Sequence, residues 1–147
     1  MDYMHIALKE AQLAAAEGEI PVGAVIVKDG QVIAKAHNRR EIDHDPTAHA
    51  EMLCMRQAAK ALGDWRLRGC TLYVTLEPCP MCAGAMVMSQ LSDCVYGAAD
   101  DKQGCCGSVY DLPADPALCG QTKWHSGVMA EECGAMMRDF FAGRRQG

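Results

Sequence analysis

Four residues in two short segments carry the side chains that could do chemistry. His49 and Glu51 lie two positions apart, and Cys79 and Cys82 form a Cys-x-x-Cys motif with a proline on either side of Cys79. One imidazole and two thiolates are ligands that zinc prefers. Three protein ligands, rather than four, leave one position for water, as in catalytic zinc sites. The sequence therefore predicts a hydrolytic zinc site held by His49, Cys79 and Cys82.

Glu51 is not expected to be a ligand. Two residues along a helix turn through about 200°, so Glu51 and His49 cannot readily share one ion. A carboxylate beside the metal is suited to moving protons, and we assign that role to Glu51.

A purely structural zinc in a small binding module is an alternative interpretation. It requires a fourth protein ligand, which Cys54 or His44 would have to supply. Taken alone, a Cys-x-x-Cys motif also occurs in redox pairs and as two buried small hydrophobes.

The elements that must position these residues follow from the periodicity of the apolar residues. The sequence predicts helices over 2–17, 46–62, 80–90 and 129–142, and strands over 22–27, 31–36, 70–76 and 93–96. Strands that alternate with helices imply an α/β fold with a sheet covered on both faces.

Two of these helices are expected to begin at the candidate ligands. Asp45-Pro46 is typical of a helix cap followed by a first-turn proline, and Cys79-Pro80 repeats the pattern. Two helix N-termini facing one ion would surround it with partial positive charge and free amide donors.

Length and composition predict one domain over residues 1–147 without a transmembrane segment or signal peptide, and hence a cytoplasmic protein. The nine cysteines are an odd number and scattered, so we expect reduced thiols. Cys54, Cys70, Cys94 and Cys133 are interpreted as buried hydrophobes, and Cys105 and Cys106 as ordinary loop residues.

The formal net charge of −5 argues against a surface that binds nucleic acid over its whole extent. A local basic patch would have to be assembled by the fold from Arg39, Arg40, Arg66, Arg68, Lys102, Lys123, Arg144 and Arg145.

Six segments carry a resemblance to a known family. They are PVGAV at 21–25, HNR at 37–39, DPTAHAE at 45–51, TLYVTLEPC at 71–79, MCAGAM at 81–86 and GS at 107–108. In these segments the chain resembles the bacterial-type tRNA-specific adenosine deaminases of the cytidine deaminase-like superfamily, and the resemblance extends over nearly its whole length.

The resemblance implies a three-layer α/β/α fold with a central mixed sheet, a homodimer, and a tRNA anticodon stem-loop as partner. It implies zinc-dependent hydrolytic deamination of the wobble adenosine to inosine, with release of ammonia. It makes His49, Cys79 and Cys82 the zinc ligands and Glu51 the proton shuttle.

The same resemblance makes Asn38 and Asp100 substrate contacts, and brings Phe140, Phe141 and Arg145 towards the anticodon loop. The chain departs from the family pattern at Ala99, where many members carry Arg, and at Ala142-Gly143, which thins the basic tail.

An alternative hypothesis is that the protein is an enzyme that deaminates a free base or nucleoside, such as a guanine or cytosine derivative. The same four residues would serve that reaction, and an acidic protein suits it.

Overall fold

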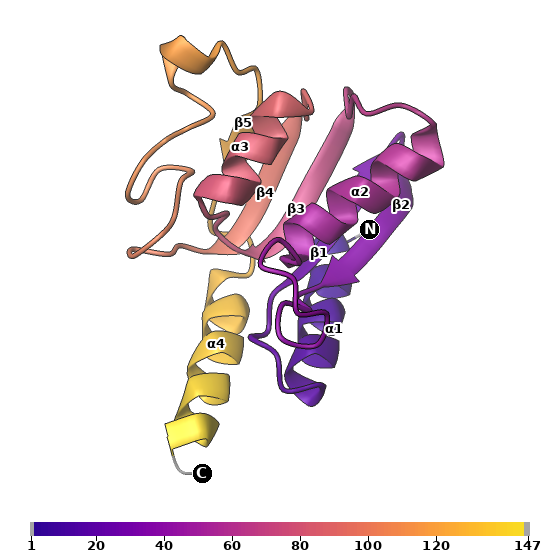
Figure 1. The fold of residues 1–147 in the computed structure, drawn as a ribbon. Helices are drawn as coiled ribbons and strands as arrows, with labels where there is room; N and C mark the ends of the chain where they lie inside the picture. The colour runs from indigo at the N-terminus through magenta and orange to yellow at the C-terminus, as the bar shows by residue number, and fades with distance from the viewer. Residues whose placement is uncertain (1, 146–147) are drawn as a thin grey trace.

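A five-stranded sheet in the order β2-β1-β3-β4-β5 forms the centre of the computed structural model, which describes residues 2–145 except the side chain of Arg145 (Figure 1). The strands are β1 (Gly23–Lys28), β2 (Gln31–His37), β3 (Cys70–Leu76), β4 (Asp93–Ala98) and β5 (Lys123–His125). The helices are α1 (Tyr3–Ala16), α2 (Ala50–Leu62), α3 (Pro80–Met88) and α4 (Ala130–Arg145), with a 3-10 turn η1 at Pro116–Leu118.

The direction of the strands brings two helix starts to one edge of the sheet. β1 is antiparallel to both β2 and β3, while β4 runs parallel to β3 and β5 parallel to β4. β2, β3 and β4 therefore all point the same way. The chain enters α2 after β2 and α3 after β3, so both helices begin at the carboxyl edge of the sheet.

Helices cover both faces of the sheet, as the alternation of elements predicts. In β1, Ala24 and Ile26 pack with residues of α2 and α3, while Val25 and Val27 pack with residues of α1 and α4. Side chains that alternate between two buried faces explain why this strand is apolar from Gly23 to Val27. The expected α/β class and the three-layer arrangement with a mixed sheet are confirmed.

The expected helix over 46–62 begins later than predicted, at Ala50. The Asp45 carboxylate accepts hydrogen bonds from the Thr47 backbone N–H (2.8 Å) and hydroxyl (2.7 Å) instead of capping a helix. This local turn holds residues 46–49 out of the helix. His49 itself is the residue before the first turn, with an extended backbone (φ −74°, ψ 152°).

The structure contains two short elements that the sequence analysis did not predict, the strand β5 and the turn η1, because three residues are too few to show a period. One further prediction is wrong. Cys105 and Cys106 are not ordinary loop residues, since they are 1% and 0% exposed in the core between the sheet and its α2 and α3 layer. Cys54, Cys70, Cys94 and Cys133 are buried as expected.

Within residues 2–145, every helix is too short or too polar to cross a bilayer.

Close packing of α1 on β1 depends on Gly23, because a Cβ there would lie 2.0 Å from the Ala7 carbonyl oxygen and 2.5 Å from the Ala11 nitrogen. We expect Gly23→Ala to lower the free energy of unfolding by at least about 2 kcal/mol, since backbone cannot yield as a side chain does. Gly143→Ala is the control, because nothing lies within 4 Å of its added Cβ. Urea unfolding checks both variants, and equal stabilities would contradict the packing argument.

Candidate active site

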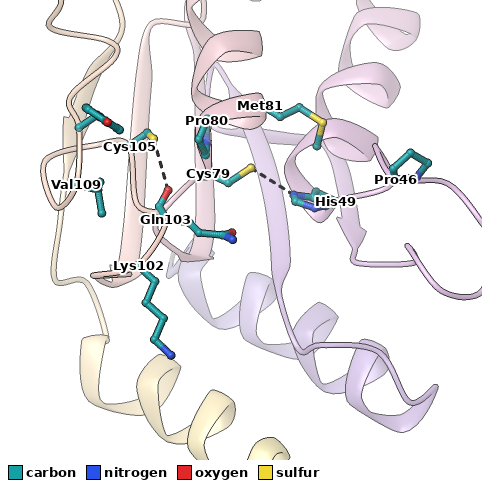
Figure 2. Close-up of a pocket in the computed structure, with 10 residues that line it drawn as sticks. Pro46, His49, Cys79, Pro80, Met81, Lys102, Gln103, Cys105 and Val109 are labelled. Atoms are coloured by element: carbon teal, nitrogen blue, oxygen red, sulfur yellow. Dashed lines mark hydrogen bonds between the residues drawn. The ribbon is translucent and has the colours of Figure 1, made fainter.

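The three predicted ligands meet at the carboxyl edge of the sheet. His49 Nδ1 lies 3.5 Å from Cys79 Sγ and 3.6 Å from Cys82 Sγ. All three ligand atoms lie within 4.8 Å of one another. Figure 2 shows the Cys79 sulfur directed at the His49 ring.

These separations fit a single tetrahedral ion. With Zn–N near 2.1 Å and Zn–S near 2.3 Å, tetrahedral angles place nitrogen and sulfur about 3.6 Å apart. The two observed distances match that value, and one imidazole with two thiolates is a donor set that selects zinc. The residues present therefore fit a zinc ion.

Two helix N-termini support the ligands. His49 is the N-cap of α2 and Cys79 the N-cap of α3, so the unpaired amides of both first turns point towards the cluster. The Cys79 thiol has its pKa lowered to about 4, first by a hydrogen bond from the Cys82 thiol and then by His49, against the opposing effect of burial. Donating that bond, together with burial, raises the pKa of Cys82. Zinc binding therefore has to displace the Cys82 proton.

Glu51 lies in the first turn of α2, next to the cluster but outside it. It is 4% exposed. Burial, with a smaller contribution from the charge of Cys79, raises its pKa to about 7. A carboxyl group with a pKa near 7 can both accept and return a proton at neutral pH.

A cavity of about 170 Å³ connects Glu51 and the ligands with the remaining predicted residues. Its lining consists of Ile20, Val22, Asn38, Arg40, His49, Ala50, Glu51, Leu76, Glu77, Cys79, Asp100, Gln103, Met137 and Phe141. A more open depression of about 430 Å³ adjoins it and shares His49, Cys79 and Gln103 (Figure 2). Lys102, Val109 and Tyr110 line its outer part.

Asn38 and Asp100 both reach the cavity, and both also hold the local backbone. Asn38 donates to the Ile20 carbonyl (3.3 Å) and accepts from the Arg40 N–H (3.1 Å). Asp100 accepts from the backbone N–H groups of Lys102 (3.0 Å) and Gln103 (3.2 Å).

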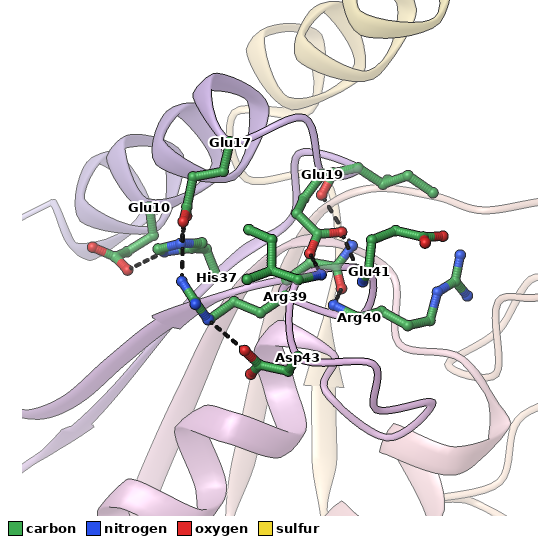
Figure 3. A network of polar contacts seen from close by, with 11 residues as sticks. Glu10, Glu17, Glu19, His37, Arg39, Arg40, Glu41 and Asp43 are labelled. Atoms are coloured by element: carbon green, nitrogen blue, oxygen red, sulfur yellow. Dashed lines mark hydrogen bonds and ion pairs between the residues drawn. The ribbon is translucent and has the colours of Figure 1, made fainter.

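A polar network fixes the chain that follows β2 (Figure 3). His37 bonds both Glu10 and Glu17 of the α1 region, and Arg39 pairs with Glu17 (3.0 Å) and Asp43 (3.2 Å). These contacts join α1 to the segment that carries Asn38 into the cavity.

Glu19 anchors the next part of this segment. Its carboxylate is 1% exposed and accepts from the N–H groups of Glu41 (3.2 Å) and Ile42 (2.9 Å). Arg40 therefore has a defined backbone position on the cavity wall.

Neither suggested fourth ligand joins the cluster. Among residues 2–144, the only group of His, Cys, Asp or Glu side chains close enough to hold a metal is His49, Cys79 and Cys82. Cys54 is packed in the hydrophobic core, and His44 is exposed in a turn. This arrangement opposes a structural site closed by four protein ligands.

The last helix contributes to the cavity through one of the two predicted aromatic residues. Phe141 lines it together with Met137. Phe140 contacts Phe141 edge to face, and the Arg144 guanidinium lies 4.9 Å from the Phe140 ring centre. The Arg145 side chain lies outside the described residues.

Sequence reasoning missed Glu77 and Gln103 as residues of the site. Glu77 is 2% exposed, and its pKa is lowered because hydrogen bonds from Ser108, Asp100 and Cys106 outweigh the opposing effect of burial. The signal was present, since an acidic residue directly after the buried strand TLYVTL needs compensating donors. Gln103 lies in an irregular loop, where no sequence pattern indicates that it lines the site.

Comparison with known proteins agrees with this site. The family model of the cytidine and deoxycytidylate deaminase zinc-binding region matches residues 1–98. The tRNA-specific adenosine deaminase of Bacillus subtilis is 53% identical over 139 residues, which cover 95% of this chain and 86% of the relative. The enzyme of the same name from Aquifex aeolicus is 45% identical, covering 95% and 91%.

Solved structures of deaminases are also similar to this chain. A structure from studies of A-to-I editing by tRNA:A34 deaminases at the wobble position has a TM-score of 0.88 and 42% identity, covering 91% of this chain and 97% of its own. The guanine deaminase of Bacillus subtilis is also 42% identical, with a TM-score of 0.63, but the match covers 66% of this chain and 62% of that chain.

The raised pKa of Glu51 predicts a pH-dependent stability of the zinc-free protein. Below pH about 4.5 the Glu51 carboxyl group is protonated in both the folded and the unfolded state, so it does not change the free energy of unfolding. As the pH rises towards 7, the group ionises in the unfolded state while it stays protonated in the folded state. The free energy of unfolding therefore falls over this range. Glu51→Gln removes this loss. We expect it to stabilise the zinc-free protein by on the order of 3 kcal/mol at pH 8 and hardly at pH 4. Urea unfolding at both pH values checks this, and an equal effect at both would contradict it.

Proposed function

The chain belongs to the bacterial tRNA-specific adenosine deaminases within the cytidine and deoxycytidylate deaminase family, and from this premise we propose that it hydrolyses the wobble adenosine of a tRNA anticodon to inosine, with release of ammonia. It is a zinc-dependent deaminase. One observation carries the reaction class: three zinc-type ligands lie beside a buried, unliganded carboxyl group at one cavity.

Each site residue has a proposed role in that reaction. His49, Cys79 and Cys82 would hold the ion, which when bound supplies a water that loses a proton near neutral pH. Glu51 takes this proton as the water oxygen bonds to C6 of adenine, and delivers it to N1. Glu51 then moves the second proton of this water from the new hydroxyl group on C6 to the exocyclic amine, which leaves as ammonia when its bond to C6 breaks.

Recognition requires the adenosine to leave its stack and enter the cavity. Asn38 and Asp100, which both line the cavity, are the proposed polar contacts for the extruded nucleoside. Phe141 offers an apolar face beside them. A base that left these buried polar groups unpaired would be disfavoured.

The RNA on either side of the nucleoside is proposed to follow the rim. Arg40 lines the cavity and Lys102 lines the adjoining depression, and both are exposed. Arg39, by contrast, is paired with two carboxylates. Two cations at the opening support phosphate contacts with the anticodon stem-loop despite the net charge of −5.

We further propose a cytoplasmic homodimer in which residues 1–147 form one deaminase domain. Exposed apolar side chains on α3 and on the loop between β4 and β5 support an interface between subunits. They are Met88, Val109, Tyr110 and Leu118.

Deamination of a free base is the second candidate, favoured by the likeness to a guanine deaminase and by the acidic composition. That likeness extends over only part of both chains, whereas the tRNA deaminases match nearly the whole of this one. Turnover of free guanine without inosine formation in RNA would establish this candidate instead.

Glu51→Ala is expected to abolish inosine formation on an anticodon stem-loop with adenosine at the wobble position. Loss of a positioned acid and base costs about 10²–10⁴-fold in rate. Zinc should remain at one ion per chain, because Glu51 is outside the ligand cluster. Glu132→Ala removes an exposed carboxylate of α4 and should leave the rate unchanged. Undiminished inosine formation by Glu51→Ala would contradict its role.

A further inference from the structure

Glu77 is the most completely bonded carboxylate near the site. Its Oε1 accepts from the Asp100 N–H (3.0 Å) and the Ser108 hydroxyl, and its Oε2 accepts from the N–H groups of Cys106 (3.0 Å) and Ser108 (3.1 Å). All these donors are uncharged and belong to the loop between β4 and β5. A buried carboxylate without such partners would be strongly destabilising, so the loop and Glu77 need each other.

The loop is shaped to enclose this carboxylate. A Cβ at Gly104 would lie 2.3 Å from Glu77 Cδ and 2.4 Å from the Asp100 carbonyl oxygen. Only a residue without a side chain allows the loop to come this close. The Cys105 N–H also donates to the Pro78 carbonyl (2.9 Å), which ties the loop to the residue between Glu77 and Cys79.

The anchored loop is also a wall of the active site. Glu77 holds it at Asp100 on one side and at Cys106 and Ser108 on the other. The residues between these anchors include Lys102, Gln103 and Cys105, which line the depression beside Cys79. Glu77 stands two residues before Cys79, so the same short segment sets both the metal ligand and the wall.

We propose that Glu77 is a positioning residue that keeps the 100–108 loop in register with the zinc site and thereby determines how well the substrate nucleoside fits. The effect on the substrate rests on the proposed function, whereas the anchoring of the loop by Glu77 does not. Glu77 takes no part in proton transfer. Because wall contacts act on bound substrate and transition state alike, their loss raises KM more than it lowers kcat.

The test compares Glu77→Gln with Asp101→Asn in the zinc-loaded full chain. Glu77→Gln keeps the size of the side chain but sets an amide NH₂ against two of the loop donors. Asp101→Asn removes an exposed carboxylate from the same loop. We expect Glu77→Gln to raise KM for the anticodon stem-loop by about tenfold or more, with kcat within about threefold. Zinc should stay at one ion per chain, and Asp101→Asn should match the wild type.

Amide hydrogen exchange measures the anchoring without substrate. In Glu77→Gln, exchange at Asp100, Cys106 and Ser108 should become faster than in the wild type. Unchanged exchange, or a loss confined to kcat or to zinc content, would overturn the proposal. Should the wild type make no inosine, the proposed function fails while the exchange comparison still decides the anchoring.

Ser108→Ala keeps the test decisive if Glu77→Gln does not fold. It removes one donor to Glu77 Oε1 and leaves the carboxylate in place. KM and loop exchange should move in the same direction by a smaller factor, and wild-type values for both would overturn the proposal.

Discussion

Two helix N-termini have to meet at one point for this site to exist. His49 is the N-cap of α2 and Cys79 the N-cap of α3, and their ligand atoms are 3.5 Å apart. The meeting point follows from the sheet, because β2 and β3 point the same way although β1 lies between them. Chain segments that leave parallel strands at the same edge bring their helix starts together there.

The electrostatics of the site follow from that meeting. The hydrogen bond from Cys82 and the neighbouring His49 lower the pKa of Cys79, and the positive ends of two helices also favour a thiolate there. Burial acts in the opposite direction on proton loss from Glu51, because it raises the pKa of this carboxyl group to about 7. Groups with opposite tendencies therefore share one cavity: the Cys79 sulfur, which readily loses its proton, and the Glu51 carboxyl group, which can carry a proton at neutral pH.

Sequence reasoning located most of the elements and all three metal-type ligands, because helical spacing, a Cys-x-x-Cys motif and a proline after Cys79 are local signals. It placed the start of α2 too early. The Asp45 carboxylate could have accepted hydrogen bonds from the first turn of a helix, but it accepts them from the backbone N–H and the hydroxyl of Thr47 instead. The role of Glu77 could not be read locally, since its donors lie 23 to 31 residues away.

Zinc-edge X-ray absorption of the zinc-loaded protein identifies the donors around the metal, and so distinguishes an active site from a structural one. We expect two sulfur donors, one imidazole nitrogen and one further light donor from water. A third sulfur or a second imidazole in the first coordination sphere would show a site closed by four protein ligands, and would contradict the assignment of this cavity as an active site.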